Sequence, residues 1–486
     1  METHSDRRGF LIRGSAALAA AGLSTDAWAM MARQRTSEPR LRVGLMADPH
    51  VVTRMRDCEG QNCLGFEPTL RFFDHSRVDA VLCCGDITDF GTPTSLRRVA
   101  EIWHRVFPGG RRSDGEPVAN LFHYGDHDTG NYANKYDWAK PYCEDPGELS
   151  ESIPDYGLGK IWEECFHEKW APIQVKDVKG YRFVLAHHPL HTAESHNGDV
   201  IPGLAEFMSR QTFDPTKPFF FSQHRPAART VCGPWADDKY DPADTKAVLR
   251  NYPNCVAFFA HWHRSCADDR NLWQDEFTAV ELPSLNYCTT ALGRQNSFCG
   301  NGRTKDLVPR ANPSRSWQAL LADVHDDRIV LHRYDMFNQR PIACPWVIPL
   351  PLPDGSAAFE KRAARSVPPE FADGASVTTE ERTEPNGMKE PVDRVVVSFP
   401  VAHGAGRRER AFDYLVTARW TGGREIARSV FSKGLYWADE RDVQPVECHF
   451  AKAELPADWR RRVSFAVTPR DSYGNGGQSL RWNPQA

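Results

Sequence analysis

The N-terminal part of the chain alternates short apolar runs with amphipathic segments. The apolar runs are bounded by polar or turn-forming residues, as buried strands are, and cover residues 42–46, 78–84, 118–124, 181–186, 218–222 and 256–260. Amphipathic segments between them predict helices at residues 68–73, 95–107 and 204–210. Strands that alternate with helices predict an α/β fold built on layered sheets.

The C-terminal part follows a different pattern. Residues 317–324 and 329–334 flank a His-Asp-Asp turn and predict a hairpin that closes the first domain, which we place at residues 40–348. Residues 349–391 are rich in Pro, Ala, Ser, Glu and Arg and lack periodicity, so we expect a linker. Beyond them the chain is strand-like at residues 395–399, 414–420, 428–432, 446–450 and 463–469. We expect residues 392–486 to form a small β-sandwich of the immunoglobulin or fibronectin type.

The first residues have the composition of a targeting segment. Arg7-Arg8, within Ser5–Ile12, resembles a twin-arginine signal, and residues 14–23 are a weakly apolar Ala/Gly-rich stretch. Ala27-Trp28-Ala29 then offers a small-x-small cleavage site. We therefore expect residues 1–29 to be a twin-arginine signal peptide and the protein to be periplasmic or secreted. No later stretch is apolar for long enough to cross a bilayer, so we expect no transmembrane anchor after cleavage.

The net charge bears on possible binding partners, and the positions of the cysteines bear on possible disulfides. Lys and Arg number 60 against 64 Asp and Glu, a net charge of −4, so no basic excess indicates a nucleic-acid partner, and none is expected. The sequence does not indicate a protein partner. Of 13 cysteines, Cys58 and Cys63 are the best local candidates for a disulfide, whereas Cys83 and Cys84 lie in an apolar run and are predicted to be buried thiols.

Five short motifs rich in Asp and His follow the ends of apolar runs. They are Asp48-Pro49-His50, Gly85-Asp86-Ile87-Thr88-Asp89, Gly125-Asp126-His127-Asp128, His224-Arg225-Pro226 and His261-Trp262-His263. Each motif alone is common in an ordinary turn. Carboxylates and imidazoles delivered from successive strand ends converge on one point, which is how proteins hold two divalent ions side by side. Together, in this order, they predict a dinuclear metal site.

The order of these motifs is similar to the signature D-x-H, G-D-x-x-D, G-N-H-D, H, G-H-x-H of the calcineurin-like metallophosphoesterases. The resemblance extends from about Arg42 to Tyr334. It implies a layered β-sandwich flanked by helices (αββα) and two divalent or trivalent metal ions, Fe, Mn, Zn or Ca. It implies that the first ion is held by Asp48, His50, Asp86 and His263, and the second by Asp86, Asp126, His224 and His261. His127 would lie outside the coordination sphere, beside the leaving group.

The physical chemistry of these residue types agrees with that implication. A bridging carboxylate such as Asp86 can hold two divalent ions at short distance, and the ions offset the charge of a phosphate ester and lower the pKa of bound water. His127 can donate a proton to the departing alkoxide or stabilise charge on a phosphoryl oxygen. We therefore predict Asp86 and His127 as the catalytic residues.

The chain departs from the signature at two positions. Asp126 replaces the usual Asn, which turns a neutral ligand into an anionic one, so the site should hold cations more tightly and attract an anionic substrate less. Ala260 replaces the Gly that usually precedes His261, and Ala resists the dihedrals that Gly permits, so we expect an ordinary backbone conformation at this residue.

Some residues have alternative interpretations. His187-His188-Pro189 fits the H-x-P pattern as His224-Arg225-Pro226 does; we favour His224, and His187, His188 and His191 could line the pocket instead. Asp89 and Asp128 are expected to orient ligands by hydrogen bonds. Arg225 and Arg264 flank ligand histidines and either contact phosphate or lie in solvent. The insert at residues 129–180 carries aromatic residues and is a candidate substrate lid, with Trp138, Tyr142, Tyr156 and Trp162.

The sequence therefore predicts an exported, metal-dependent phosphoric ester hydrolase. Water, as a metal-bound hydroxide, would attack phosphorus directly, without a covalent enzyme intermediate. A phosphodiesterase rather than a phosphomonoesterase is the alternative within this class. A non-catalytic metal-binding surface module is the alternative outside it, although His127 supplies a proton donor that metal binding alone does not require.

Overall fold

The computed structural model describes residues 38–52, 65–130, 152–189, 201–231, 243–290, 293–297, 316–386, 390–404, 411–432 and 445–484. The expected signal peptide lies outside these ranges, as do Cys58, Cys63, Trp138, Tyr142 and His191. Every cysteine within them is a free thiol, and Cys83 and Cys84 are buried as predicted. Among the helices of these ranges, none has the length and apolar character that crossing a membrane requires.

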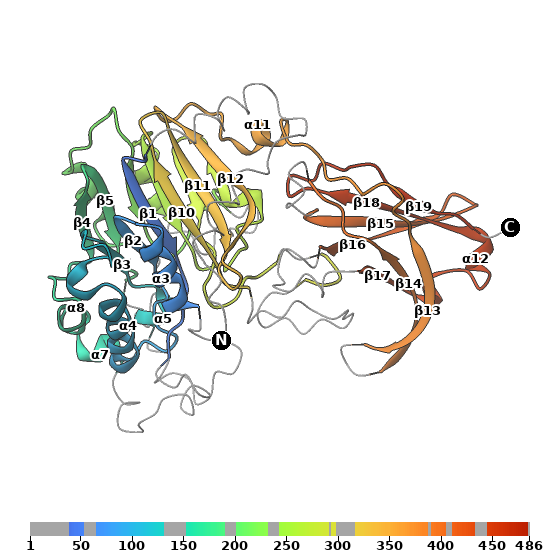
Figure 1. Ribbon diagram of the computed structural model, residues 1–486, viewed down its shortest axis with the longest axis horizontal. Helices are drawn as coiled ribbons and strands as arrows, with labels where there is room; N and C mark the ends of the chain where they lie inside the picture. Colours follow the sequence, from blue (N-terminus) through green and yellow to red (C-terminus); the bar gives the residue numbers. More distant parts are fainter. Residues whose placement is uncertain are drawn as a thin grey trace, which may run out of the picture.

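Two six-stranded sheets form the larger part of the molecule (Figure 1). The first sheet has the order β12-β11-β10-β1-β2-β3, with β1 (Leu41–Met46), β2 (Ala80–Cys84), β3 (Ala119–His123), β10 (Gln318–Val324), β11 (Arg328–Asp335) and β12 (Arg340–Pro349). The second has the order β4-β5-β6-β7-β9-β8, with β4 (Ile173–Val178), β5 (Tyr181–Ala186), β6 (Phe219–Ser222), β7 (Cys255–Phe259), β8 (Leu272–Gln274) and β9 (Thr278–Glu281).

Three apolar cores separate four layers of structure. The residues between the two sheets include Leu45, Leu82 and Phe258, all buried. The outer face of the first sheet is covered by α3 (Phe66–His75), α4 (Pro93–Val106), α7 (Ile153–Tyr156) and α8 (Leu158–Phe166). The outer face of the second sheet is covered by α9 (Leu204–Ser209) and α10 (Ala243–Leu249). The predicted α/β layered sandwich flanked by helices is confirmed.

Parallel pairing aligns the strand ends that carry the motifs. β1, β2 and β3 run parallel, with Met46 opposite Cys83 and Cys84 opposite His123. β5, β6, β7 and β9 also run parallel in the second sheet. β2 is buried at all five positions, as a strand covered on both faces must be. The carboxyl ends of these strands therefore meet at common edges, where the Asp- and His-rich motifs begin.

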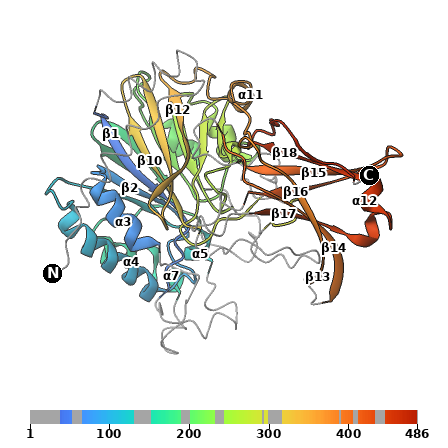
Figure 2. The ribbon, with the colours of Figure 1, turned by 45° about the vertical axis from the view of Figure 1, so that its right-hand side comes forward.

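A second, smaller body of β-structure follows (Figure 2). One sheet has the order β13-β14-β17 and the other β16-β15-β18-β19, with β13 (Thr378–Pro385), β14 (Pro391–Phe399), β15 (Asp413–Trp420), β16 (Glu425–Phe431), β17 (Val446–Ala451), β18 (Val463–Arg470) and β19 (Leu480–Trp482). Val397, Tyr414 and Phe465 belong to the core that the two sheets share. The fourth strand of this sandwich, β16, lies in the second sheet. In constant-type immunoglobulin domains the fourth strand lies in the same sheet as the first strand.

The segment expected to be a linker contains regular structure. It includes α11 (Phe359–Ala363) and β13, which pairs with β14 over eight positions. β13 has the sequence TTEERTEP and lies at the edge of its sheet. Charged residues on an edge strand discourage pairing with other chains. A strand composed of them lacks the alternation of apolar and polar residues by which strands are recognised in a sequence. That is why the composition of residues 349–391 did not reveal this strand.

Asp269 joins the larger sheets to the smaller sandwich. Its Oδ1 accepts hydrogen bonds from Trp346 Nε1 at 2.6 Å and Arg333 Nη1 at 3.3 Å, and Arg362 Nη1 lies 3.4 Å away. Its Oδ2 accepts from the Ser472 hydroxyl of the sandwich at 2.5 Å. Both arginines have side chains that are at most 10% exposed. One carboxylate thus neutralises two largely buried guanidinium groups at the junction.

Asp269→Ala is expected to lower the free energy of unfolding by about 3 kcal/mol, because it leaves buried cations without their counter-ion. Urea unfolding followed by circular dichroism measures this change. Asp326→Ala is the matched control: its partner Arg40 is exposed, so the loss should be below about 1 kcal/mol. Equal losses in the two variants would contradict this role of Asp269.

A bidentate ion pair joins β1 to β10. Arg42 lies opposite Asp323, and its Nε and Nη2 donate to the two carboxylate oxygens at 2.6 and 2.9 Å. Burial raises the pKa of Asp323, but hydrogen bonds from His332 and Arg42 outweigh it and lower the pKa to about 2. A depressed carboxyl pKa contributes stability above the pKa of the unfolded chain, and this contribution is lost as pH falls.

We therefore expect Asp323 to add about 1–2 kcal/mol to the free energy of unfolding at pH 5, and this contribution to disappear between about pH 4 and pH 2. Urea unfolding of wild-type protein and Asp323→Asn, both in EDTA, measures the difference at each pH. A difference that is unchanged at pH 2 would show that the carboxylate charge is not responsible.

Candidate metal centre

The seven predicted ligands come together in two overlapping groups. One group is Asp48, His50, Asp86 and His263, and the other is Asp86, Asp126, His224 and His261. Within each group the candidate ligand atoms all lie within 4.8 Å of one another. Asp86 is the residue that the two groups share. The motifs after β1, β2, β3, β6 and β7 supply these side chains, so the convergence follows from the strand order.

The first group places ring nitrogens against carboxylate oxygens. His263 Nε2 lies 3.2 Å from Asp48 Oδ1 and 3.2 Å from His50 Nε2. His50 Nε2 lies 3.7 Å from Asp86 Oδ2. All four side chains are buried, with His263 the most exposed at 6%.

The second group is equally compact. His224 Nε2 lies 3.1 Å from Asp86 Oδ2 and 3.0 Å from Asp126 Oδ1. His261 Nδ1 lies 3.1 Å from the same oxygen of Asp126. Burial raises the pKa of Asp126, but His261, His224 and Arg225 outweigh it and hold the pKa well below its usual range. Asp126 is therefore an anionic ligand candidate.

The unsatisfied carboxylate of Asp48 fits a bound cation. Asp48 is fully buried, and neither of its oxygens accepts a hydrogen bond from another part of the described chain. An ionised carboxylate buried without hydrogen bonds is strongly disfavoured unless positive charge lies next to it, and the imidazole nitrogens that surround Asp48 are themselves metal-ligand atoms. Imidazole nitrogens and carboxylate oxygens together suit divalent ions from Mn to Zn. The donor set therefore fits two metal ions that share Asp86.

Backbone strain is concentrated in the same residues. Asp48, His50, Asp86, His261 and His263 have φ between 46° and 78°, a region that residues with a Cβ seldom occupy. Each such residue costs about 1–3 kcal/mol, which persists only where the surroundings impose it. Ala260 does not have a positive φ, as expected from its side chain; the strain falls on His261 instead.

Two glycines make room for the ligands. A Cβ on Gly85, which has a φ of 80°, would lie 2.5 Å from His224 Nδ1. A Cβ on Gly125 would lie 2.2 Å from the backbone nitrogen and from Oδ1 of Asp86. Both contacts are too short for any side chain, so the glycine before each Asp in these motifs has a steric reason.

Residues 41–265 match the family model described as calcineurin-like phosphoesterase. This part of the chain is a calcineurin-like phosphoesterase domain. The domain assigns the protein to the metal-dependent phosphoester hydrolases, and the buried Asp and His residues supply its candidate metal site. No curated protein matches the chain by sequence.

Several solved structures are similar to parts of the chain. A dimetal phosphatase from Danio rerio has 12% identity and a TM-score of 0.36, over 64% of this chain and 99% of that one. A purple acid phosphatase from yellow lupin (Lupinus luteus) seeds has 11% identity and a TM-score of 0.40, over 63% and 53%. GAP50, the anchor in the inner membrane complex of Plasmodium, has 10% identity and a TM-score of 0.36, over 64% and 89%. These likenesses are weak, and the assignment of the phosphoesterase domain stands on the family model and the site geometry.

Hydrogen bonds behind the ligands orient three imidazole rings of the phosphoesterase domain. His50 Nδ1 lies 2.9 Å from Asp89 Oδ1, as expected of an orienting carboxylate. His224 Nδ1 lies 2.7 Å from the carbonyl oxygen of Cys84, and His263 Nδ1 lies 3.0 Å from that of Tyr287. In each ring the Nδ1 contact leaves Nε2 directed at the cluster, which fixes the tautomer suited to metal binding. Backbone acceptors leave no signal in the sequence, so Cys84 and Tyr287 were missed.

Asp128 orients the ligands through the backbone of their loops rather than through their side chains. It does not touch a ligand side chain; its oxygens accept from the backbone nitrogens of Gly125 at 2.7 Å, Ile87 at 3.1 Å and Thr88 at 2.8 Å. The Thr88 hydroxyl also donates to it at 2.7 Å. Asp128 thus ties the loop after β2 to the loop after β3 and fixes the separation of Asp86 and Asp126.

His127 lies at the edge of the cluster and is its most exposed member, at 26% of its side-chain surface. Its Nδ1 lies 2.7 Å from the carbonyl oxygen of Asp89, and its backbone N–H donates to Asp86 Oδ1 at 2.9 Å. Burial lowers the pKa of His127, but the carboxylates of Asp86, Asp89 and Asp126 outweigh it and raise the pKa to about 9. Among the chain's own groups, His127 is thus poised to carry a proton at neutral pH.

His187 is a core residue rather than part of the cluster. Its Nδ1 accepts from the backbone N–H of Tyr124 at 3.1 Å, and its ring packs against Trp162 and Trp170. Burial holds its pKa well below the usual range. His188 is also buried, with its Nδ1 3.2 Å from the Thr129 hydroxyl. The structure thus brings His224, not His187, to the other ligand candidates, and neither His187 nor His188 lies in the metal groups.

Two of the four aromatic residues of the expected lid, Tyr156 and Trp162, lie within the described residues. Trp162 is fully buried in the core beneath α8, and Tyr156 packs against the same core. Trp162 therefore stabilises the helical layer and does not line a cleft, which corrects our expectation for it. Tyr156 is only partly buried, and its hydroxyl donates to Glu164 Oε2 at 2.9 Å. The burial of Trp162 follows from the packing of α8 on α4, and α7 packs in turn against α8.

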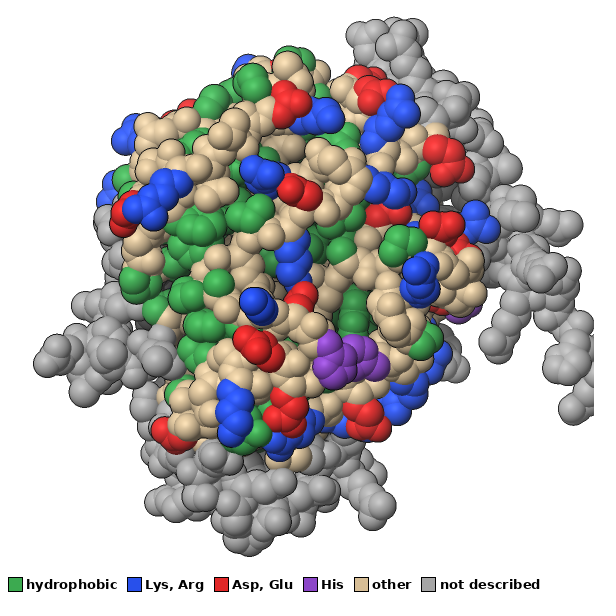
Figure 3. Space-filling model, turned by 90° about the vertical axis from the view of Figure 1, so that its left-hand side faces the viewer, with side chains coloured by type: hydrophobic (Ala, Val, Ile, Leu, Met, Phe, Trp, Pro, Cys, Tyr) green, Lys and Arg blue, Asp and Glu red, His purple; other side chains and the backbone are tan. Residues whose placement is uncertain are grey.

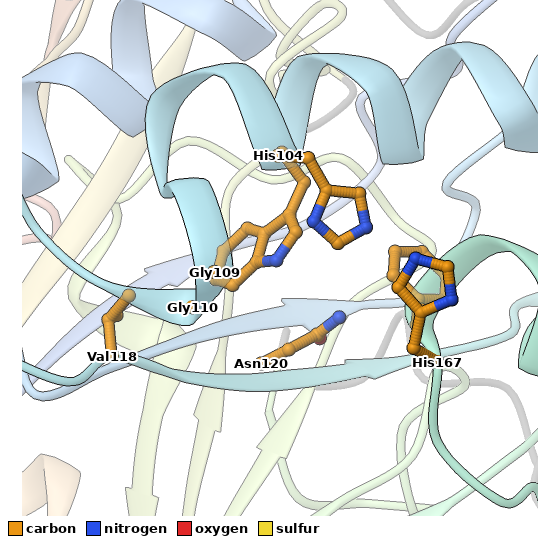
Figure 4. A pocket seen from close by; sticks show the side chains of 8 residues that line it. His104, Gly109, Gly110, Val118, Asn120 and His167 are labelled. Carbon is orange, nitrogen blue, oxygen red and sulfur yellow. The ribbon is translucent and has the colours of Figure 1, made fainter.

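A surface pocket lies between α4, α8 and the edge strand β3, with the lining residues Trp103, His104, Gly109, Gly110, Val118, Asn120, Phe166 and His167 (Figure 4). The rings of His104 and His167 stack with centroids 5.4 Å apart. Figure 3 looks onto this side of the molecule, where positive and negative side chains are interspersed. No residue of the two ligand groups lines the pocket, so it is separate from the metal centre.

Proposed function

We propose that the protein is an exported dinuclear-metal phosphoesterase that hydrolyses phosphate esters with water as the direct nucleophile. The observation that carries this proposal is the pair of buried ligand groups sharing Asp86, one of which includes Asp48, a buried carboxylate whose oxygens accept no hydrogen bond from the described chain. Two bound cations would offset the charge of the phosphate and lower the pKa of the attacking water. Fe, Mn, Zn or Ca are the candidates, in divalent or trivalent form.

The residues around the cations divide the remaining work. The loop ties made by Asp128 and the strained turns hold the ligands in place before substrate binds, so the site needs little rearrangement. His127 lies beside this cluster and donates a proton to the departing alkoxide, which otherwise leaves poorly. Metal binding alone does not require a proton donor at that position, and this favours catalysis over a non-catalytic metal-binding surface module.

The test is a parallel assay of purified protein reconstituted with Mn, Zn, Fe or Ca. A chromogenic phosphomonoester and the matching diester are offered at equal concentration, since either ester class suits the site and a phosphodiesterase is the alternative to a monoesterase. Metal-dependent turnover that is absent from Asp86→Asn supports the proposal, and the ratio of the two rates assigns the ester class. Two bound ions without turnover of either ester would favour the non-catalytic module.

Export through the twin-arginine route is part of the proposal and is supported by Arg7-Arg8, the Ala/Gly-rich stretch and Ala27-Trp28-Ala29. Replacing both arginines by lysine is expected to keep the precursor in the cytoplasm while the folded protein stays active in extracts. Cell fractionation with immunoblotting measures this, and unchanged export of the double variant would rule out the twin-arginine route. A lysine pair far from the terminus, Arg460→Lys with Arg461→Lys, is the control.

A further inference from the structure

Asp126 divides its carboxylate between the metal cluster and a cation. Oδ1 faces His224 Nε2 at 3.0 Å and His261 Nδ1 at 3.1 Å. Oδ2 accepts a hydrogen bond from Arg225 Nη2 at 3.2 Å. Asp126 is 2% exposed and Arg225 is 8% exposed, so the pair is shielded from solvent. The residue that departs from the Asn of the family signature is therefore also the one that contacts a buried arginine.

Neighbouring residues hold Arg225 in this position. The side-chain amide of Gln223 donates to the backbone carbonyl of Arg225 at 2.7 Å. Gln223 Oε1 in turn accepts from the Thr245 hydroxyl on α10 at 3.0 Å. Gln223 and Thr245 are both buried. The main chain at Arg225 is thus anchored to a helix on the outer face of the second sheet, and this fixes the base from which its side chain reaches Asp126.

The charge of Arg225 matches the extra charge of Asp126. The ligand set contains three carboxylates, Asp48, Asp86 and Asp126, which leave one net positive charge against two divalent cations. Arg225 raises this to two, the value that an Asn at position 126 would give without any arginine. A net positive centre attracts an anionic ester, and opposite charges interact strongly where solvent is excluded.

Hydrogen-bond chemistry explains why an acid occupies position 126 beside this arginine. A guanidinium has only N–H donors, and a carboxylate has only acceptors. An Asn with its oxygen directed at the histidines would turn its NH₂ group toward Arg225, so donor would face donor in a buried site. Asp avoids this conflict because both of its carboxylate oxygens are acceptors.

We propose that Arg225 is a positioning residue that holds Asp126 as an anionic ligand and returns the metal centre to the charge of the usual Asn-containing site. This inference rests on the proposed function, because it assumes that the two ligand groups bind cations. It predicts that Arg225 and Asp126 act as a unit: with Arg225 removed, Asn becomes acceptable at position 126.

The test is calorimetric titration of metal-free protein with Mn²⁺, which does not depend on turnover. Asp126→Asn is expected to weaken binding of one of the two ions at least about tenfold. Adding Arg225→Met to that variant should restore most of the lost affinity. In the Asp126→Asn background, Arg225→Lys keeps the charge and should not restore it. With wild-type Asp126 retained, Arg225→Met should raise KM for a phosphate ester about tenfold, with Mn²⁺ affinity kept or increased.

Arg264→Met in the Asp126→Asn background is the matched control, since Arg264 follows the ligand histidine His263 in the loop after β7. No recovery of Mn²⁺ affinity is expected in this variant. Thermal melts establish that each variant is folded. If Arg225→Met weakens Mn²⁺ binding equally with Asp and with Asn at position 126, the coupling does not exist and the inference is wrong. If wild-type protein binds no Mn²⁺ or Zn²⁺, both the inference and the proposed function fail. The loss of coupling described above defeats only the inference, so the two failures are distinguishable.

Discussion

Asp86→Asn is expected to lower kcat/KM for phosphate esters by at least about a thousandfold. Asp86 is the residue common to both ligand groups, with Oδ2 3.1 Å from His224 Nε2 and 3.7 Å from His50 Nε2. Its Oδ1 accepts the backbone N–H of His127. An amide would remove the negative charge and place a donor where one of these positions requires an acceptor, so at least one ion should bind more weakly. Steady-state kinetics at saturating metal, with metal content from plasma mass spectrometry, measure both effects.

Asp114→Asn is the control for this substitution. Asp114 lies on the surface and pairs with Arg112, far in the fold from the ligand groups, so turnover should not change. The shared role of Asp86 would be refuted if Asp86→Asn retained more than about a tenth of wild-type kcat/KM with both ions bound.

His127→Gln is expected to lower kcat by about a hundredfold to ten-thousandfold for esters with alkyl leaving groups. The loss should be much smaller for a nitrophenyl ester, because nitrophenolate leaves without protonation. Metal content should stay at the wild-type value, since the His127 ring contacts Asp89 and His50 rather than completing either four-residue ligand group. Rates for a series of esters with leaving groups of increasing pKa measure the dependence.

The slope of log kcat against leaving-group pKa separates a proton donor from a structural residue. A donor makes the slope of the variant steeper than that of the wild type. Parallel lines would show that His127 only supports the loop or the phosphoryl oxygens. His104→Gln, at the separate pocket between α4 and α8, is the matched control and should leave the slope and kcat unchanged.

The convergence of the ligands could be predicted because strand order alone brings the motifs together. Each motif follows a short apolar run. Parallel pairing of β1 with β2 in the first sheet, and of β6 with β7 in the second, brings the ends of those runs to one edge of each sheet. The choice of His224 over His187 also followed from the position of strands and helices. The same physical rule, that parallel strands end together, predicts both the layered fold and the position of the site.

The features of the site that could not be predicted depend on backbone conformation, which the pattern of side chains does not encode. The positive φ of Asp48 and His263 and the carbonyl contact from Cys84 to His224 are consequences of the tight turns after the strands. Trp162 was misjudged because an aromatic residue in an insert looks the same in sequence whether it lines a cleft or fills a core. β13 escaped notice because its sequence, TTEERTEP, has polar and charged residues and no apolar positions that alternate with them.

The most direct test of the account is a crystal structure of the protein grown with Mn²⁺ or Zn²⁺, with anomalous scattering recorded at the metal absorption edge. The account predicts two anomalous peaks, both adjacent to Asp86, one ligated by Asp48, His50 and His263 and the other by Asp126, His224 and His261. A single peak, or two peaks that do not share Asp86, would contradict the dinuclear centre on which the phosphoesterase mechanism depends.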